Sequence, residues 1–236
     1  MVWGFTGQTW STVPLSSDNQ HLNLKEYYAA HPELHSKYRN FHAYVNQTML
    51  KLSEPVGHRR NSYDDPLTPI EDHEWPTEFR TMVAKEKAGR LKSLLDMSGS
   101  GKWLVADQSL KELIERFEPG VHQFRPVRVT SWGTDFPGDS QFYTLLIDQF
   151  IDSFSPKQSD PDSFTDRPDS LNDQRAYTGW RNYDRIALSR AVFGGAHLWR
   201  EKCVRRPTFF MSDELRKAIK EAGLKTPPFV KMKEVA

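Results

Sequence analysis

The sequence of 236 residues has a single cysteine, Cys203, and no long apolar run. One cysteine excludes an intramolecular disulfide and a Cys-x-x-Cys metal knuckle. No window reaches the roughly 18–20 consecutive apolar residues of a membrane-spanning helix. The first ten residues also lack the basic and apolar regions of a secretory signal. These absences predict a cytoplasmic protein that neither spans a membrane nor depends on disulfides.

A large excess of one charge is also absent, because the formal net charge is only +1. Over the whole chain, charge therefore does not point to a nucleic-acid or acidic partner. Aromatic residues, in contrast, are plentiful: 7 Trp, 8 Tyr and 14 Phe. This content argues against wholesale disorder, and a chain of this length buries a sizeable core without a disulfide or a metal. We expect a folded core with long hydrophilic loops.

Two apolar stripes predict helices in the first hundred residues. From His31-Pro32 to Leu52, apolar residues recur every three or four positions, as on one face of a helix. A second helix is expected after Trp75-Pro76; its apolar residues are Phe79, Met82, Val83, Leu91, Leu94 and Leu95. The glycine-rich turn at 98–101 ends it. The pattern predicts a mainly helical region over residues 1–98.

Residues 99–236 have a different pattern, in which short apolar runs alternate with helical stripes. Strands are expected at Lys102–Ala106, Phe124–Val129 and Tyr143–Ile147, with Asp107 as the N-cap of a helix between the first two. The Asp-, Ser- and Pro-rich residues 148–173 predict an exposed loop. Strands at 185–192 and 196–200 are then expected to form a hairpin through Gly194-Gly195.

Residues 104–129 match residues 209–234 after a shift of 105 positions without a gap. The shift aligns these pairs: Leu104 with Phe209, Val105 with Phe210, Asp107 with Ser212, Leu110 with Leu215, Ile114 with Ile219, Phe124 with Phe229 and Val127 with Met232. Each copy has the pattern of a strand, a polar N-cap, a helix and a second strand, either through an internal repeat or through shared capping rules. The sequence thus predicts an α+β fold: a helical region over 1–98, then an α+β domain over 99–236 with mostly antiparallel strands and two strand–helix–strand units.

Motifs that would carry chemistry are incomplete. Ser98-Gly-Ser-Gly-Lys102 lacks the first glycine and the Ser or Thr after the lysine that a phosphate loop needs. His31-Pro-Glu-Leu-His35 has its glutamate at the wrong offset for a zinc hydrolase, although His42 lies two turns further on. His58, His73, His122 and His197 have no companion at ligand spacing and are expected to be structural.

A catalytic nucleophile is not indicated either. The basic neighbours of Cys203 would lower the pKa of an exposed thiol, but no glycine-rich elbow or local signature accompanies it. We predict no catalytic residue, no cofactor and no metal.

Charge is distributed unevenly along the second half. Residues 148–173 contain seven aspartates against Lys157 and Arg167, whereas residues 175–236 contain fourteen Lys and Arg against six Asp and Glu. The basic part, with interleaved Arg, Tyr and Trp, is compatible with a nucleic-acid surface. The acidic part is compatible with docking of a basic protein, because complementary potentials accelerate encounter. Ordinary solvated surface explains both segments equally well.

The residues from Arg185 to Arg200 and from Thr208 to Lys225 resemble the end of a bacterial family of immunity proteins from polymorphic toxin systems, the eleventh immunity class. The matching positions are Gly195, His197, Leu198, Trp199 and Arg200, then Ser212, Glu214, Leu215, Ala222, Gly223 and Leu224. Trp199 stands where the family usually has phenylalanine, and Thr226-Pro227-Pro228 replace an expected glycine. The resemblance covers residues 100–236.

The resemblance implies an intracellular protein, not an enzyme, that binds and neutralises one antibacterial toxin delivered by contact or by a system such as type VI secretion. We expect the acidic loop to bind this partner through Asp160, Asp162, Asp166 and Asp169, with Phe164 as an anchor. His197, Trp199 and Arg200 fit a structural or a functional role. The alternatives are an enzyme with a dispersed hydrolase or transferase site and a nucleic-acid-binding regulatory module.

Overall fold

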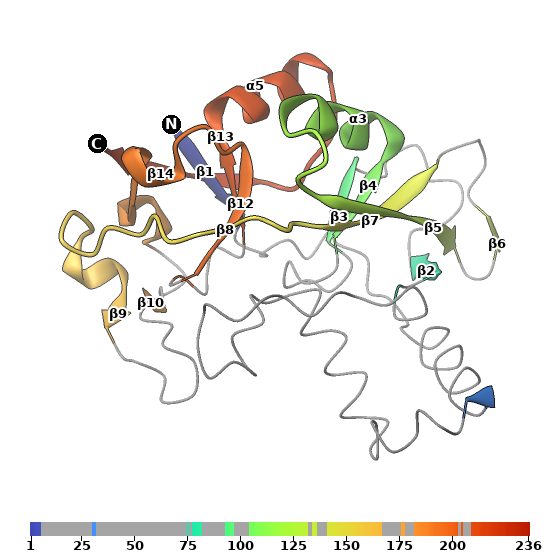
Figure 1. The fold of residues 1–236 in the computed structure, drawn as a ribbon, viewed down its shortest axis with the longest axis horizontal. Helices are drawn as coiled ribbons and strands as arrows, with labels where there is room; N and C mark the ends of the chain where they lie inside the picture. Colours follow the sequence, from blue (N-terminus) through green and yellow to red (C-terminus); the bar gives the residue numbers. More distant parts are fainter. Residues whose placement is uncertain are drawn as a thin grey trace.

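Two six-stranded β-sheets form most of the regular structure in the described part of the chain (Figure 1). The computed structural model describes residues 1–5, 30–31, 75, 77–81, 93–96, 104–131, 134–135, 141–166, 176–177, 182–202, 204 and 209–236.

The first sheet has the strand order β11-β14-β1-β13-β12-β8. Its strands are β1 (Val2–Phe5), β8 (Phe150–Ile151), β11 (Ala187–Ser189), β12 (Leu198–Glu201), β13 (Phe209–Ser212) and β14 (Phe229–Val235). β1 lies between β13 and β14 and runs antiparallel to both. The two edge strands, β11 and β8, are each parallel to their neighbours.

The second sheet has the order β2-β5-β7-β4-β3, and β6 also pairs with β5. Its strands are β2 (Glu78–Thr81), β3 (Leu94–Asp96), β4 (Leu104–Asp107), β5 (Gln123–Ser131), β6 (Thr134–Asp135) and β7 (Phe142–Leu146). A separate two-stranded sheet pairs β9 (Thr165–Asp166) with β10 (Ala176–Tyr177).

Three short α-helices occur in the described residues: α3 (Gln108–Phe117), α4 (Arg190–Phe193) and α5 (Asp213–Glu221). Two 3-10 turns, η5 (Pro161–Ser163) and η6 (Tyr183–Arg185), complete the elements. Figure 1 shows α3 and α5 side by side along the same side of the two sheets. None of the described helices is long and apolar enough to cross a membrane.

One apolar core joins both sheets to these two helices. It includes residues of the first sheet and α5 (Phe5, Leu198, Phe209, Met211, Leu215, Ile219) and of the second sheet and α3 (Leu94, Leu104, Ala106, Leu110, Ile114, Leu145). Burying each Leu, Ile or Phe side chain contributes roughly 1.5–3 kcal/mol. A second core lies around Trp199, whose ring stacks on Phe193 at 5.0 Å and on Phe210 at 5.9 Å.

The two matching segments fold as β4–α3–β5 and β13–α5–β14. Their N-caps are equivalent, since Asp107 accepts a hydrogen bond from the Leu110 amide at 2.8 Å and Ser212 accepts one from the Leu215 amide at 3.1 Å. The aligned apolar residues of both helices are buried in the same core. The predicted strand at 102–106 is confirmed from Leu104 onward, where the described residues begin, and so are the cap at Asp107 and the strands near 124–129 and 143–147.

The predicted fold class is wrong. Where the sequence predicted a helical N-terminal region before an α+β domain, the described residues are mostly β-sheet with three short helices. The second predicted helix contains β2 and β3 instead. Short apolar runs such as Leu94-Leu95 fit a strand or a helix equally well, and pairing with a distant strand decides between them. The first predicted helix lies outside the described residues beyond His31.

Two further predictions are wrong. The expected hairpin does not form, because β11 pairs with β14 and β12 pairs with β13 and β8, so the two strands lie far apart in one sheet. Gly194, with φ of 54°, is the C-cap of the short helix α4 and does not form a hairpin turn. The described part of the expected exposed loop, residues 148–166, contains β8, η5, β9 and the buried residues Ser153, Ser159 and Ser163, and residues 167–173 lie outside the described part.

The division into domains at 98/99 stays a prediction. In the described residues, β1, β2 and β3 from the first part pair with strands of the second part.

Candidate functional site

The acidic turn, residues 160–164, contains three of the five predicted partner-binding residues. Asp160 caps η5 by accepting a hydrogen bond from the Asp162 amide at 2.9 Å. The Ser163 hydroxyl donates to the Asp160 carbonyl at 2.6 Å. Pro161 stands at the start of η5, where its fixed φ suits the turn. The turn is therefore ordered by its own short-range contacts.

The 3-10 turn η6 and its cap residue Asn182 contact the acidic turn. The Asp160 amide donates to the Arg185 carbonyl at 3.2 Å, and the Arg185 guanidinium lies 3.1 Å from the Asp160 carboxylate. Asn182 donates to the Asp162 carbonyl at 3.5 Å. The ion pair is solvated, with the Arg185 side chain 53% exposed, and contributes less than about 1 kcal/mol. Asp160 thus has a structural contact, whereas Asp162 is exposed.

Phe164 is half-buried and does not project freely. Its ring meets Phe154 edge-on at 5.2 Å, and it packs against the core around Trp199. The backbone of Asp166 pairs with Ala176 in β9 and β10. Its side chain and all of Asp169 lie outside the described part. The structure therefore brings together Asp160, Asp162 and Phe164 on one turn.

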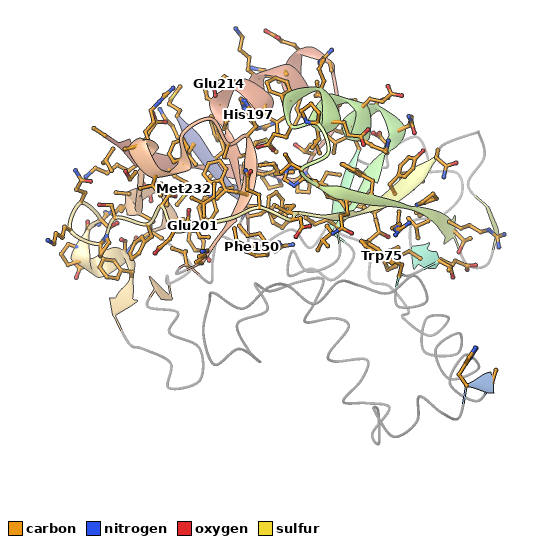
Figure 2. All side chains as sticks on the ribbon, in the orientation of Figure 1. Trp75, Phe150, His197, Glu201, Glu214 and Met232 are labelled. Carbon is orange, nitrogen blue, oxygen red and sulfur yellow. The ribbon has the colours of Figure 1, made fainter. Side chains whose placement is uncertain are left out.

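Glu201, the last residue of β12, has a buried carboxylate (Figure 2). It accepts hydrogen bonds from the amides of Ser153 at 2.9 Å and Phe154 at 3.2 Å, from the Ser153 hydroxyl, and from the Trp199 indole at 2.9 Å. Burial, with the negative charge of Asp152 as a smaller cause, raises the pKa of Glu201 to about 7, against the hydrogen bonds from Ser153 and Trp199 that lower it. Glu201 joins β12 to the segment before the acidic turn.

That segment, residues 153–155, also extends the first sheet. Ser189 donates its amide to the Ser153 carbonyl at 2.7 Å, Ser155 donates to Ala187 at 2.9 Å, and Phe154 forms a bridge with Leu188. The Ser153 and Phe154 amides of the same segment donate to the Glu201 carboxylate. The acidic turn begins five residues after Ser155. Its position consequently depends on β11 and Glu201.

A second buried carboxylate, that of Glu118, follows α3. It accepts hydrogen bonds from the His122 ring at 2.7 Å, the Gln149 amide at 3.1 Å and the His197 backbone N–H at 2.7 Å. Burial alone would raise the pKa of Glu118, but the hydrogen bonds from His122, His197 and Gln149 outweigh it and hold the pKa below its usual value. Among the described residues, Nδ1 of His122 has no hydrogen-bond partner.

Of the residues that carried the family resemblance, those in β12 are buried, and His197, directly before the strand, is half-buried. His197 contacts the Ser212 hydroxyl at 2.8 Å and meets the Phe117 ring edge-on at 4.8 Å. Trp199 and Arg200 are buried, and Figure 2 shows His197 and Glu201 at opposite ends of β12. These contacts favour a structural role, as expected for His122 and His197.

Metal and nucleophile candidates contribute no assembled site in the described ranges. There, no group of three or more His, Cys, Asp or Glu side chains is placed to hold a metal ion. Of the His31 and His35 pair that was weighed as a metal site, only His31 is described, and His35, His42 and Cys203 lie outside the described residues.

Comparison with models of known protein families gives a match over most of the chain. A model described as the immunity protein family (Imm11) matches residues 19–234. The chain belongs to the Imm11 immunity protein family. The match includes most of residues 1–98, whereas the resemblance found in the sequence covered only residues 100–236, so the Imm11 pattern extends over both parts of the chain. A search of curated proteins found no match.

Reasoning from the sequence missed the two buried glutamates of this Imm11 protein. A signal was present for Glu201, which follows Trp199 by two positions in an apolar strand and so lies on the same face. Glu118 follows the last turn of α3 directly, and no local pattern distinguishes it from an exposed helix end.

Proposed function

We propose that this Imm11 protein protects the cell that makes it by binding one cognate antibacterial toxin and blocking it, without catalysis. The observation that carries the proposal is the family match over residues 19–234. The two buried carboxylates are also consistent with it, because Glu118 and Glu201 are hydrogen-bonded to groups of the protein itself. We place this encounter in the cytoplasm, after delivery of the toxin by a contact-dependent or type VI system.

The proposed docking surface is the acidic segment with Asp160, Asp162, Phe164, Asp166 and Asp169. Its first part is held by the Asp160 cap and the Arg185 contact, so little conformational freedom is lost when a partner binds it. The exposed Asp162 carboxylate suits a basic toxin surface, because opposite potentials accelerate association. Phe164 remains the proposed anchor, and its contact with Phe154 holds its ring in place on the turn.

The test takes its probe from the adjacent reading frame: if that frame encodes a large secreted protein with a variable C-terminal domain, this domain is the probe. Cells that express this domain should survive when the Imm11 protein is co-expressed, and the two proteins should co-purify. Asp162→Lys should slow association and weaken binding at low salt about tenfold. Glu221→Lys, a charge reversal at an exposed position of α5, is the matched control.

The outcomes separate the function from the surface. Absence of both binding and protection contradicts the immunity proposal. Full binding by Asp162→Lys, with protection retained, contradicts only the docking surface. A nucleic-acid-binding protein would instead bind a DNA or RNA pool with a steep dependence on salt.

A further inference from the structure

Each of the two strand–helix–strand units surrounds a third strand in the same way. β7 lies between β4 and β5, β1 lies between β13 and β14, and each third strand is antiparallel to both of its neighbours. The registers agree as well, because the residues that the shift of 105 positions aligns pair with equivalent residues of the third strand. The pairs are Leu104 and Phe124 with Leu145 in the first unit, and Phe209 and Phe229 with Phe5 in the second. Shared capping rules do not determine the register of a third strand, so the two units are structural copies of each other.

Each copy holds one cation of its helix over two aromatic rings of its strands. In the first copy the Nζ atom of Lys111 lies 5.7 Å from the centroid of the Phe124 ring. In the second copy the Cζ atom of Arg216 lies 5.4 Å from the centroid of the Phe229 ring, and the shift aligns both members of these two pairs. The other ring comes from the third strand of each copy, Tyr143 of β7 at 5.1 Å from Lys111 and Trp3 of β1 at 5.9 Å from Arg216.

The two copies differ in the charges next to this cation. In the first copy Lys111 is neutralised by Glu115, whose carboxylate lies 2.8 Å from the ammonium group. The shift places Lys220 at the position of Glu115 on the helix, and Lys231 at the position of Pro126 on the last strand. Both of these lysines are exposed. One copy therefore has a neutralised lysine where the other has three cations.

Three cations of the second copy, Arg216, Lys220 and Lys231, form a surface that we call the basic ledge. Lys231 pairs with Trp3 between β14 and β1, and paired residues point to the same face of a sheet. That is the face on which the Arg216 guanidinium covers the Trp3 ring. Lys220 follows Arg216 by four positions on α5, so it lies on the same side of the helix. The basic ledge thus extends along α5 and β14.

The Arg216 guanidinium is held in position by the rings and keeps donors for a ligand. Among the described residues, its hydrogen-bond contact is the Thr226 hydroxyl at 3.5 Å, and it forms no ion pair. The carboxylate one turn earlier on α5, that of Asp213, accepts the Trp3 indole at 2.9 Å. A guanidinium has five N–H donors in a planar fork that matches the two oxygens of a carboxylate. Because the fork is already positioned, little side-chain entropy is lost when a carboxylate binds.

The aromatic rings of the basic ledge favour an acidic protein segment over a nucleic acid. Proteins that bind single-stranded nucleic acids stack the bases on open aromatic faces. The Trp3 and Phe229 rings already carry the Arg216 guanidinium and pack against the apolar core. Carboxylates need only the guanidinium and the two ammonium groups, which the basic ledge presents.

We propose that the basic ledge binds an acidic segment of the cognate toxin, as a second contact beside the acidic turn. This inference rests on the proposed immunity function. Lys233, two residues after Lys231 on the same face of β14, donates to the Gln158 carbonyl at 2.8 Å. Gln158 lies two residues before Asp160, so the basic ledge and the acidic turn adjoin. Two adjoining surfaces of opposite charge fix the orientation in which a toxin of complementary charge docks.

Lys220→Glu and Lys231→Glu test the basic ledge, because both side chains are exposed and Arg216 stays over its rings. The probe is the same toxin domain from the adjacent reading frame, titrated with the full chain at low salt. Each variant should weaken binding about tenfold, mainly through slower association. Arg116→Glu is the matched control, because Arg116 is the exposed cation in the last turn of α3, as Lys220 is in α5. Both changes disturb a helix end equally, and Arg116→Glu should leave binding unchanged.

A measurement on the unaltered complex covers the case in which a variant does not fold. A carbodiimide couples lysine amines to carboxylates in contact with them, and mass spectrometry locates the coupled residues. Lys220 and Lys231 should couple to Asp or Glu residues of the toxin domain. A complex in which neither lysine couples to the toxin contradicts the basic ledge.

The remaining outcomes separate this surface from the immunity function. If the original protein does not bind the toxin domain, both fail. If Lys220→Glu and Lys231→Glu bind it as tightly as the original protein, only the basic ledge fails. An equal loss in Arg116→Glu also contradicts the ledge, because overall charge would then govern binding. A DNA or RNA pool that the original protein binds and these two lysine variants release would overturn the acidic protein partner.

Discussion

Glu118 Oε1 accepts a hydrogen bond of 2.7 Å from the backbone N–H of His197, a residue 79 positions further along the chain. The bond joins the end of α3, in the first strand–helix–strand unit, to the start of β12, which pairs with β13 of the second unit. The same carboxylate binds His122 and Gln149. One buried acceptor therefore satisfies donors from three separate segments of the chain.

Removal of this acceptor should destabilise the fold strongly. Glu118→Ala leaves the His197 amide, the Gln149 amide and the His122 ring without their partner in a buried place. Such unpaired buried donors cost about 3 kcal/mol of unfolding free energy in total. Urea denaturation followed by tryptophan fluorescence measures the loss. Glu118→Gln keeps one acceptor oxygen and should lose less, and equal losses in both variants would contradict this account.

The two buried glutamates should give opposite pH dependences of stability. Glu201 has a folded-state pKa of about 7, above its ordinary 4.5, so its contribution is complete below pH 4.5 and is lost as pH rises through 7. The loss is up to about 3 kcal/mol. The pKa of Glu118 is lowered, so its contribution is present above pH 4.5 and is lost as pH falls through the folded-state pKa.

Urea midpoints between pH 3 and 8 measure both effects. Glu201→Gln should flatten the profile between pH 4.5 and 7 without changing the acid limb, and Glu118→Gln should flatten only the acid limb. If the urea midpoint of Glu201→Gln falls between pH 4.5 and 7 as steeply as that of the original protein, the loss of stability in this range is not due to Glu201.

The two equivalent helix caps should differ in strength. Asp107→Ala removes only the hydrogen bond to the Leu110 amide and should cost about 1 kcal/mol. Ser212→Ala removes the bond to Leu215 and also the contact with the His197 ring, so it should cost about 2 kcal/mol. Thermal unfolding of the two variants gives the comparison. An equal loss in both would show that the His197 contact adds nothing.

Local patterns in the sequence predicted the strand–helix–strand units well. The strand before Asp107, the cap itself and the stripe of Leu110, Leu113 and Ile114 are all encoded within fifteen residues. The same holds for Ser212 and α5. These features depend on neighbours in the chain, so a single sequence is sufficient to recognise them.

The strand pairings could not be predicted, because they depend on distant residues. Ala187–Ser189 was correctly expected to be extended, but its partner is β14 rather than the nearby β12. In the acidic segment, a high content of Ser and Asp indicated an exposed loop. Ser153, Ser159 and Ser163 are nevertheless buried, because their hydroxyls bind Glu201 and backbone groups.

The candidate site was predicted only in part for the same reason. Asp160 and Asp162 were named from charge, and both lie on one turn, but charge cannot reveal that Asp160 is engaged by Arg185. A buried glutamate such as Glu201 needs donors from two other segments, and a single sequence does not indicate which segments meet.

Trp199 should control both the packing of the second core and the titration of Glu201. Trp199→Phe removes part of a fully buried ring that stacks between Phe193 and Phe210, and should cost about 2 kcal/mol. It also removes an indole donor that stabilises the ionised carboxylate, so the pKa of Glu201 should rise further. The ¹³C titration of the Glu201 carboxyl measures this shift.

Phe193→Leu is the matched control for Trp199→Phe, because it loosens the same stack on the other side and leaves the indole donor in place. It should lower the unfolding free energy without moving the midpoint of the Glu201 titration. If both variants move that midpoint equally, then packing rather than the indole hydrogen bond sets the pKa. If neither moves it, the indole does not donate to Glu201 in solution, and the carboxyl is held by Ser153 and Phe154 alone.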